Sequence, residues 1–401
     1  MAYIESRSLS AGFWGNYIQA GALKLQDEHP QTPLKGMNVM IDGDIPPNAG
    51  VSSSSTLVVG SLLALCQINK IPLAWDELVE RAGSAEWYVG TRGGAGDHAA
   101  MLLGRYRKIL HAGFKPFTTS YFPFPEQVDV FLLLSGIDSR KSAETKHTFN
   151  SRIASYELAL HLFHAAWPAF QAKIPLIRDI HPEQMGISLA QLYQTIKKIP
   201  VQATWAELQQ EYPCPRDEIA RIAKMYQVGT EPLPLREVFL FGIAECQRAK
   251  QFPELLEKGG IQEAGELMYI SHNGDRVASW VHETPRPYRS AFTDAYLDRL
   301  SHLAEKGAPE ADLHVQPGGY RCSLPEMDLI VDICKHIPGI YGAGLTGAGL
   351  GGAIVALADR AKTNTIQAML KEFMNDLALH RAKIELCRPV AGAAFIEPPP
   401  A

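Results

Sequence analysis

Residues 44–66 of the chain read DIPPNAGVSSSSTLVVGSLLALC, so two prolines and a glycine lead into four serines and then a long apolar run. The apolar run is too dense for a surface helix and predicts a buried helix over 53–68. The turn made by Pro46, Pro47 and Gly50 leaves backbone N–H groups without partners at the start of that helix. Those groups, the helix dipole and the serine hydroxyls together favour an anion such as a phosphate.

The serine run also fits a plainer interpretation, which is an ordinary serine cap on a core helix. Serine is common at helix starts, so the run taken alone favours the cap over a binding site. A flexible linker fits poorly, because the apolar residues that follow at once have to be buried. This stretch therefore cannot decide the function by itself.

Composition restricts the class of protein. The 401 residues suffice for two sizeable domains, and 46% hydrophobic residues support real cores. The balance of 38 basic against 43 acidic residues gives a net charge of −5, which argues against a nucleic-acid or anionic-membrane partner. The chain start shows no export signal and no apolar run is long enough to span a membrane, so a cytoplasmic protein is expected. Six scattered cysteines without a CxxC pair indicate reduced thiols: Cys66, Cys214, Cys246, Cys322, Cys334 and Cys387.

Periodicity predicts an α+β protein of two domains. The proline-containing segment 116–127 separates an expected domain 1–125 from a domain 126–401, with a helical insertion at about 172–250. The expected elements are helices at 75–88, 325–336 and 362–378, a hairpin around 106–112, and strands at 128–134, 353–358 and 393–396. A glycine-rich turn is expected over 342–352.

The second informative stretch is AEWYVGTRGGAGDHAAML at 85–102. It crosses a glycine-rich loop between two carboxylates, Glu86 and Asp97. A carboxylate after such a loop suits a general base or a metal ligand, because glycine lets a ligand approach the backbone closely. The structural alternative is a tight loop in which Asp97 only caps the next helix.

The third stretch is YGAGLTGAGLGGAIVAL at 341–357, in which Gly342, Gly344 and Gly347 match the G-x-G-x-x-G fingerprint. A dinucleotide site needs that fingerprint between a strand and a helix. Here a helix is expected before it and a short β-rich segment after it, so the Rossmann interpretation is rejected. The sequence also contains no GxxxxGK[ST], HExxH or G-x-S-x-G motif.

In this order, the three stretches resemble the GHMP superfamily of small-molecule kinases. Residues 46–55 (PPNAGVSSSS) are similar to its first phosphate motif, P-x-x-x-G-L-(G/S)-S-S-A, and 345–352 (LTGAGLGG) to its third motif. The galactokinase branch is indicated by FWGNY at 13–17 and by the likeness of 85–100 to A-E…G-x-x-G-G-x-M-D-Q. VGTRGGAGD, HTFNSR and CSLPEMDLIVDICK resemble the N-acetylgalactosamine kinases of that branch more closely.

The chain departs from the family pattern in three places. The opening G-R-x-N-x-I-G-E-H-x-D-Y segment is not found, so much of the usual N-terminal domain is expected to be missing. Gly96 and His98 replace the methionine and glutamine of M-D-Q. Phe149 stands where the galactokinases have a tyrosine that contacts the sugar.

The resemblance implies a fold with a ribosomal protein S5 domain 2-like N-terminal half, here truncated, and a ferredoxin-like C-terminal half. It implies an ATP-dependent kinase that phosphorylates the anomeric hydroxyl of galactose or a related sugar such as N-acetylgalactosamine, with ATP and Mg²⁺. Asp97 would be the catalytic base, and Ser54 with Glu86 would hold the metal. The implied ATP-binding residues are Gly50, Val51, Ser52, Ser53, Ser54, Ser55, Thr346, Gly347 and Gly349. The implied sugar-binding residues are Asp97, Gly94, Phe149 and Gly347.

Two alternatives remain open on the sequence. The chain could be a catalytically inactive family member that senses a nucleotide or a sugar, because of the missing segment and the altered M-D-Q surroundings. It could also be another GHMP small-molecule kinase of the homoserine or mevalonate type, which shares the first and third motifs. The oligomeric state and the identity of the sugar stay undetermined.

Overall fold

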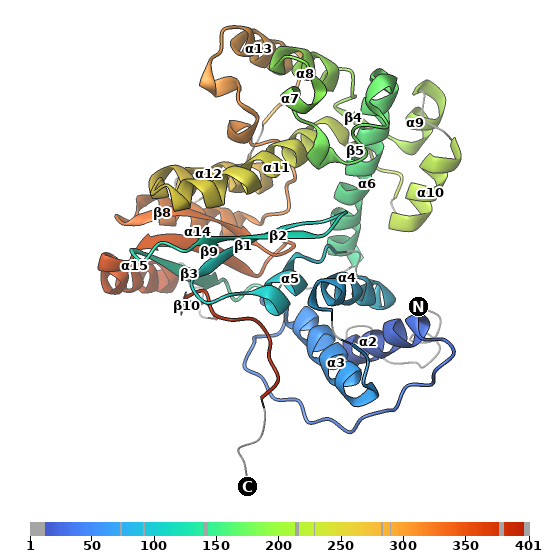
Figure 1. Ribbon diagram of the computed structural model, residues 1–401. Coiled ribbons are helices and arrows are strands. Elements are labelled where there is room, and N and C mark those ends of the chain that lie inside the picture. Colours follow the sequence, from blue (N-terminus) through green and yellow to red (C-terminus); the bar gives the residue numbers. More distant parts are fainter. Residues whose placement is uncertain are drawn as a thin grey trace. The chain divides into compact units, whose positions relative to one another are not determined.

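The computed structural model (Figure 1) describes residues 13–72, 74–90, 93–138, 143–212, 216–227, 229–281, 284–288, 290–376 and 381–396. Thr91, Arg92 and Cys214 lie outside the described residues, as do 377 and 378 at the end of the helix expected over 362–378. The chain forms two compact units, Met1–Glu126 with Cys387–Ala401, and Gln127–Leu386. Helices and strands occur in both, which confirms the predicted α+β class.

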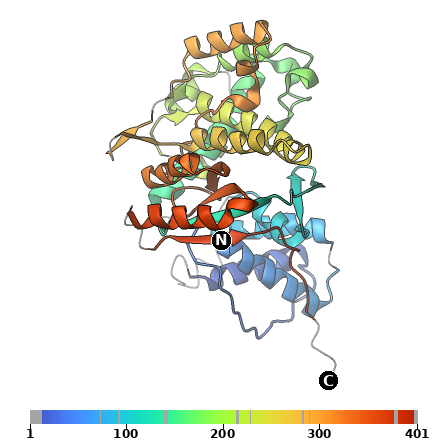
Figure 2. The same cartoon turned by 90° about the vertical axis from the view of Figure 1, so that its left-hand side faces the viewer.

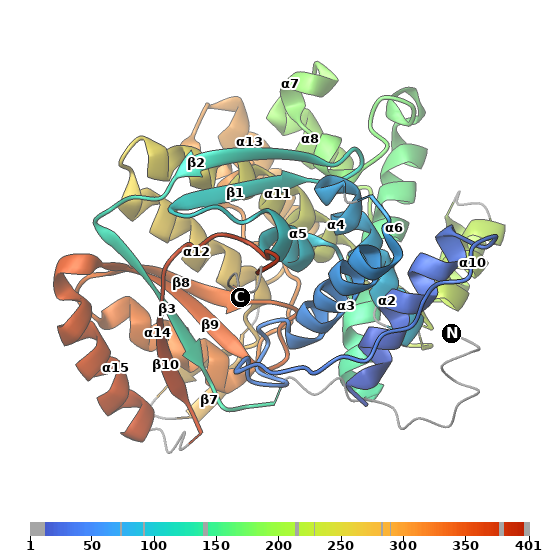
Figure 3. The same cartoon turned by 60° about the horizontal axis from the view of Figure 1, so that its bottom comes forward.

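The first unit is built around the helix that the serine run opens. Its elements are α2 (Gly15–Glu28), α3 (Ser53–Asn69), α4 (Trp75–Ala85), a 3₁₀ helix (Glu86–Val89), α5 (Gly96–Leu103), β1 (Lys108–Gly113) and β2 (Thr118–Pro123). The prediction of a buried helix over 53–68 is confirmed, since α3 places Val58, Leu62 and Cys66 at 0% exposure in the core of this unit. Each fully buried valine or leucine stabilises such a core by about 2 kcal/mol. Figure 3 shows α2 and α3 side by side.

The hairpin of the first unit is longer than predicted. β1 and β2 pair antiparallel from Lys108 opposite Pro123 to Gly113 opposite Thr118. β2 therefore lies inside the segment 116–127, which the sequence presented as a boundary because of its prolines. Its residues TTSYFP include threonines and aromatics that favour a strand, and the prolines lie outside the strand or at its last position.

The second unit contains a four-stranded sheet in the order β10-β3-β9-β8. The strands are β3 (Val128–Leu134), β8 (Ile340–Thr346), β9 (Ala353–Asp359) and β10 (Lys383–Cys387). β9 pairs antiparallel with both β3 and β8. Two helices, α14 (Pro325–His336) and α15 (Thr363–Asp376), share one hydrophobic core with the sheet, and Figure 2 shows the orange-red α15 beside the strands. The predicted helix at 325–336 and strands at 128–134 and 353–358 are confirmed.

A mainly helical part of the second unit lies between β3 and α14 in the chain. Its longer elements are α6 (Ala143–Ala166), α8 (Leu189–Ile196), α10 (Arg216–Tyr226), α11 (Leu235–Glu257), α12 (Ile261–Asp275) and α13 (Asp294–Glu305). Its shorter helices are α7 (Pro182–Met185) and α9 (Trp205–Glu211), with 3₁₀ turns at Pro168–Phe170, Ile177–Asp179, Pro309–Ala311 and Leu313–Val315. Two small antiparallel pairs complete it: β4 (Gln202–Ala203) with β5 (Leu233–Pro234), and β6 (Ala278–Val281) with β7 (Thr284–Pro287). Leu158, Leu192 and Phe239 are fully buried in its own core.

The glycine-rich segment is a strand followed by a turn. β8 continues to Thr346, so only residues 347–352 form the turn expected over 342–352. The helix expected before the fingerprint is present as α14, which ends at His336, but the strand β8 that follows it was not predicted. The Rossmann interpretation is still excluded, since the element after the turn is the antiparallel strand β9 rather than a helix.

The closing strand was predicted in the wrong place. The last strand of the sheet is β10 at 383–387, and residues 393–396 form no strand. The backbone at 392 and 393 bonds instead to the end of α5: Gly392 N donates to Gly104 O at 2.8 Å, and Ala393 N donates to Met101 O at 2.6 Å. The last described residues therefore pack within the first unit.

Candidate active site

The serine run enters α3 through a left-handed residue. Ser52 precedes the helix with φ 58°, and its side chain makes no capping hydrogen bond to the helix. The first intrahelical bond runs from Thr56 N to Ser52 O at 3.1 Å. The N–H groups of Ser53, Ser54 and Ser55 precede this bond, so they have no carbonyl partner within the helix. The simple serine-cap interpretation is wrong for Ser52, whose hydroxyl has another partner.

That partner is Asp97. Asp97 is exposed in the first turn of α5, and one of its carboxylate oxygens accepts a hydrogen bond from the Ser52 hydroxyl. Ala95, not Asp97, occupies the cap position of α5. The alternative in which Asp97 only caps this helix is therefore not realised. The two motifs at 44–66 and 85–102 meet through this bond, although 45 positions separate the two residues.

A second contact joins the same motifs below the surface. The Ser55 hydroxyl donates to Glu86 Oε1 at 2.7 Å, and Ser55 and Glu86 are only 3% and 6% exposed. His98 Nε2 lies 3.6 Å from the same carboxylate oxygen, and His98 is 1% exposed. In the sequence His98 stood out only as a departure from M-D-Q. No pattern in the neighbouring residues predicted that it is buried against Glu86.

Magnesium was predicted to lie between Ser54 and Glu86. In the structure the hydroxyl that bonds Glu86 belongs to Ser55, one position later, and Ser54 is half-buried in the first helical turn. Among the described residues no group of three or more histidine, cysteine or acidic side chains could hold a metal. A carboxylate and serine hydroxyls nevertheless fit Mg²⁺, which prefers oxygen ligands and takes only one or two carboxylates beside substrate phosphates.

The remaining predicted residues of the first unit lie on loops or at helix starts. Gly50 has φ 71°, a conformation that glycine adopts without strain. Val51 and Ser53 are half-buried beside it. Gly94 is exposed, and no atom lies within 4 Å of the position where a Cβ would stand.

The predicted residues of the second unit include the glycine turn. Thr346 ends β8, and Gly347 and Gly349 follow with φ 76° and 75°. Gly347 is exposed, whereas Gly349 is buried and a Cβ there would lie 2.2 Å from Cys322 O. Leu350 N donates to Cys322 O at 2.6 Å, and Gly352 N donates to Ile137 O at 3.0 Å, so both sides of the turn are fixed.

Two further side chains of the second unit, Phe149 and Asp275, bear on the site. Phe149, predicted to face the sugar, is half-buried on α6. Asp275, at the end of α12, accepts a hydrogen bond from the Cys322 backbone N–H, and burial raises the pKa of its carboxyl to about 7. Asp275 was missed in the sequence, because nothing in its neighbours marks a buried carboxyl.

Comparison with known proteins identifies the family and the fold. Residues 16–105 match the family model of the GHMP kinases N terminal domain, and residues 289–376 match that of the GHMP kinases C terminal domain. A galactokinase from Roseiflexus sp. is 25% identical over 384 residues, covering 96% of this chain and 75% of the relative. The chain belongs to the GHMP kinases, on their galactokinase branch.

Other relatives agree with this assignment. A galactokinase from Dictyostelium discoideum is 26% identical, with 88% of this chain and 67% of the relative covered. The crystal structure of Lactococcus lactis galactokinase complexed with galactose superposes with a TM-score of 0.63 at 16% identity, covering 98% of this chain and 79% of that one. The predicted two-part GHMP fold is thereby confirmed. In the described part of the chain, no helix combines the length and apolar character that a membrane span requires.

Proposed function

We propose that this GHMP kinase transfers the γ-phosphoryl group of ATP to the anomeric hydroxyl of galactose or of a related sugar such as N-acetylgalactosamine. The observation that carries the proposal is the contact between Ser52, at the start of α3, and the exposed carboxylate of Asp97. It brings a candidate base to the serine-rich helix start where phosphate oxygens would be bound.

In this proposal Asp97 accepts the proton of the sugar hydroxyl as that oxygen bonds to the γ-phosphorus. The bond from the γ-phosphorus to the bridging oxygen breaks, and ADP leaves with the electron pair. The N–H groups and hydroxyls of residues 50–55 neutralise phosphate charge without moving, because the helix start is already formed. Phosphoryl transfer depends chiefly on such positioning and charge stabilisation.

The other predicted residues have supporting roles in the same proposal. Ser54 and Glu86 would hold Mg²⁺, which supplies charge neutralisation at the β- and γ-phosphates. Thr346, Gly347 and Gly349 would contact ATP through a turn whose backbone is accessible at Gly347. Gly94, Gly347 and Phe149 would face the sugar, and the phenyl ring of Phe149 can offer only an apolar contact there.

The test is sugar-dependent ADP formation by the purified chain with galactose, N-acetylgalactosamine and, as class controls, homoserine and mevalonate. The proposal predicts turnover with one of the two sugars and none with the controls. Turnover with homoserine or mevalonate alone would assign the chain to another GHMP activity. Calorimetry that detects ATP binding while no acceptor is phosphorylated would favour the sensor alternative, for which the replacement of M-D-Q by Gly96-Asp97-His98 is the motive.

A further inference from the structure

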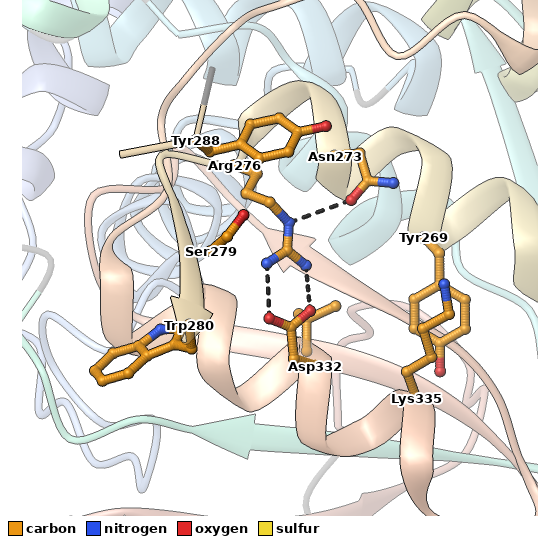
Figure 4. A pocket seen from close by; sticks show the side chains of 9 residues that line it. Tyr269, Asn273, Arg276, Ser279, Trp280, Tyr288, Asp332 and Lys335 are labelled. Carbon is orange, nitrogen blue, oxygen red and sulfur yellow. Dashed lines mark hydrogen bonds and ion pairs between the residues drawn. The ribbon is translucent and has the colours of Figure 1, made fainter. Parts of the chain in front are cut away.

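A polar pocket of about 310 Å³ lies in the second unit between α12, β6 and α14 (Figure 4). Its volume is at the lower end of the range of small-molecule sites. None of the residues predicted for ATP, magnesium or sugar lines it. The polar side chains that matter for its chemistry are Asn273, Arg276, Ser279, Asp332 and Lys335.

An ion pair forms the base of the pocket. Arg276 donates from both terminal nitrogens to Asp332, at 2.9 and 2.6 Å, and its Nε donates to Asn273 Oδ1 at 3.2 Å. The Arg276 side chain is 8% exposed and that of Asp332 is 35% exposed. Because the guanidinium is held from two sides, it is rigid and electrically balanced. The carboxylate oxygens of Asp332 still have lone pairs that can accept from a ligand hydroxyl.

The β6–β7 hairpin beside this pair is fixed to α14. Asp328 is fully buried, and one of its carboxylate oxygens accepts from Val277 N at 2.9 Å and from Ala278 N at 2.7 Å. Trp280 Nε1 donates to Pro325 O at 2.7 Å. These bonds join the start of β6 to the first turn of α14, so the pocket is formed before any ligand arrives.

A positive charge lies on the other side of the pocket, beside a tyrosine whose hydroxyl is buried. Lys335 Nζ lies 5.4 Å from the centre of the Tyr269 ring, and Figure 4 shows the two side chains alongside each other. Lys335 is exposed, and no carboxylate pairs with it among the ion pairs of the described residues. Tyr269 is 7% exposed, and within the described structure its hydroxyl has no hydrogen-bond partner.

We propose that this pocket binds a phosphorylated monosaccharide. With Arg276 and Lys335 against Asp332, it carries one net positive charge, and the ammonium of Lys335 is free to take the phosphate. Asn273, Ser279 and Asp332 supply both donors and acceptors, which the hydroxyls of a sugar require. The rings of Tyr269 and Tyr288 provide apolar surface for the C–H face of the sugar. This inference does not depend on the proposed function, because it uses none of the same residues.

Titration calorimetry on the full chain tests this site with glucose 6-phosphate, galactose 1-phosphate, free galactose and inorganic phosphate. Glucose 6-phosphate, which is neither substrate nor product of the proposed reaction, is expected to bind more tightly than inorganic phosphate, and any binding of free galactose is not expected to change in the Lys335 variant. Lys335→Gln should weaken the binding of glucose 6-phosphate about tenfold, since it removes a charge-assisted hydrogen bond. Asn273→Ala should weaken the binding of the phosphorylated sugar without changing the affinity for inorganic phosphate. Lys371→Gln, which changes another exposed lysine on α15, is the matched control and should bind as the wild type does.

Three results would overturn the inference. The first is that neither phosphorylated sugar binds, and the second is that Lys335→Gln binds them as the wild type does. The third is that inorganic phosphate binds as tightly as the phosphorylated sugars, which would mean a simple anion site. Because Lys335 is exposed, its replacement leaves the core intact, and equal thermal unfolding midpoints for Lys335→Gln and Lys371→Gln confirm that both variants are folded.

Discussion

The serine-rich start of α3 and the glycine turn after β8 were both predicted to hold ATP, yet they are built differently. At the serine start, side chains make the contacts: Ser52 bonds Asp97, and Ser55 bonds Glu86. At the glycine turn the backbone does so, through the bonds that Leu350 and Gly352 donate to Cys322 and Ile137. One segment is held by hydroxyl–carboxylate pairs and the other by conformations that only glycine adopts easily.

This difference predicts how each segment responds to mutation. Replacing a hydroxyl or a carboxylate at the start of α3 should change chemistry and metal dependence while the fold persists. Adding a methyl group in the glycine turn should change stability, because the turn has no spare space at Gly349. Single substitutions in the two segments should therefore separate loss of activity from loss of stability.

Asp97→Asn should cause the largest loss. An amide cannot accept the proton of the sugar hydroxyl, so kcat should fall about 100-fold or more, while the KM for ATP changes little. Steady-state ADP formation measures both constants. Asp76→Asn is the matched control, since Asp76 is also an exposed aspartate in the first turn of a helix. Unchanged turnover in Asp97→Asn would remove Asp97 from the mechanism.

Gly349→Ala should destabilise the chain by about 2 kcal/mol or more. The alanine would be strained at φ 75°, and its Cβ would lie 2.2 Å from Cys322 O. Gly307→Ala is the control, because Gly307 has φ 66° but no atom within 4 Å of its Cβ position, so only the cost of the backbone conformation, about 1 kcal/mol, applies. Urea unfolding measures both. Equal losses would show that Cys322 moves aside without penalty.

Ser55→Ala should raise the Mg²⁺ concentration needed for half-maximal rate about tenfold. The change removes the hydroxyl that donates to Glu86 Oε1, and a hydrogen bond to an ionised group is worth about 2 kcal/mol. Rates at fixed ATP over a series of Mg²⁺ concentrations measure the effect. Ser61→Ala on the same helix removes a buried hydroxyl that bonds the carbonyl of Val58 rather than a carboxylate, so it should leave the Mg²⁺ dependence unchanged. If Ser55→Ala and Ser61→Ala show the same Mg²⁺ dependence, Ser55 does not contribute to the metal site.

Asp275→Asn should change the pH dependence of stability. Burial raises the pKa of Asp275 in the native chain to about 7, from a usual value of 3.8. Between these values the native state holds a proton that the unfolded chain has lost, so the free energy of unfolding falls as the pH rises from about 4 to about 7. The asparagine variant lacks this contribution. Urea unfolding at pH 5, 6, 7 and 8 should therefore give a shallower decline for the variant; parallel profiles would contradict the assignment.

Much of the fold could be predicted because strong patterns determine it. The dense apolar run after the serines gave α3, and the buried strand VDVFLLL gave β3. The prediction was wrong at 393–396, where the tail bonds residues 101 and 104 of the first unit rather than joining the sheet. No local pattern distinguishes those two partners, because strand pairing depends on segments that are distant in the chain.

The motifs of the candidate site could be predicted from the sequence, but the hydrogen bonds between their side chains could not. Asp97 stood out because it follows a glycine loop, whereas nothing in the sequence indicated that the hydroxyl of Ser55 bonds Glu86. Successive residues on a helix point about 100° apart, and four identical serines give no periodic sign of which one faces inward. Only the packing of α3 against its neighbours decides that Ser55, rather than Ser54, is buried beside Glu86.

Transfer of the γ-phosphoryl group to the sugar can be observed on the phosphorus atom itself. Phosphorus NMR of the wild-type chain with Mg²⁺, ATP and galactose or N-acetylgalactosamine should show the γ-phosphate signal replaced by that of a sugar 1-phosphate. The same mixture with Asp97→Asn should stay essentially unchanged over the same time. Transfer to a hydroxyl other than the anomeric one, release of free phosphate alone, or equal product from Asp97→Asn would contradict the account.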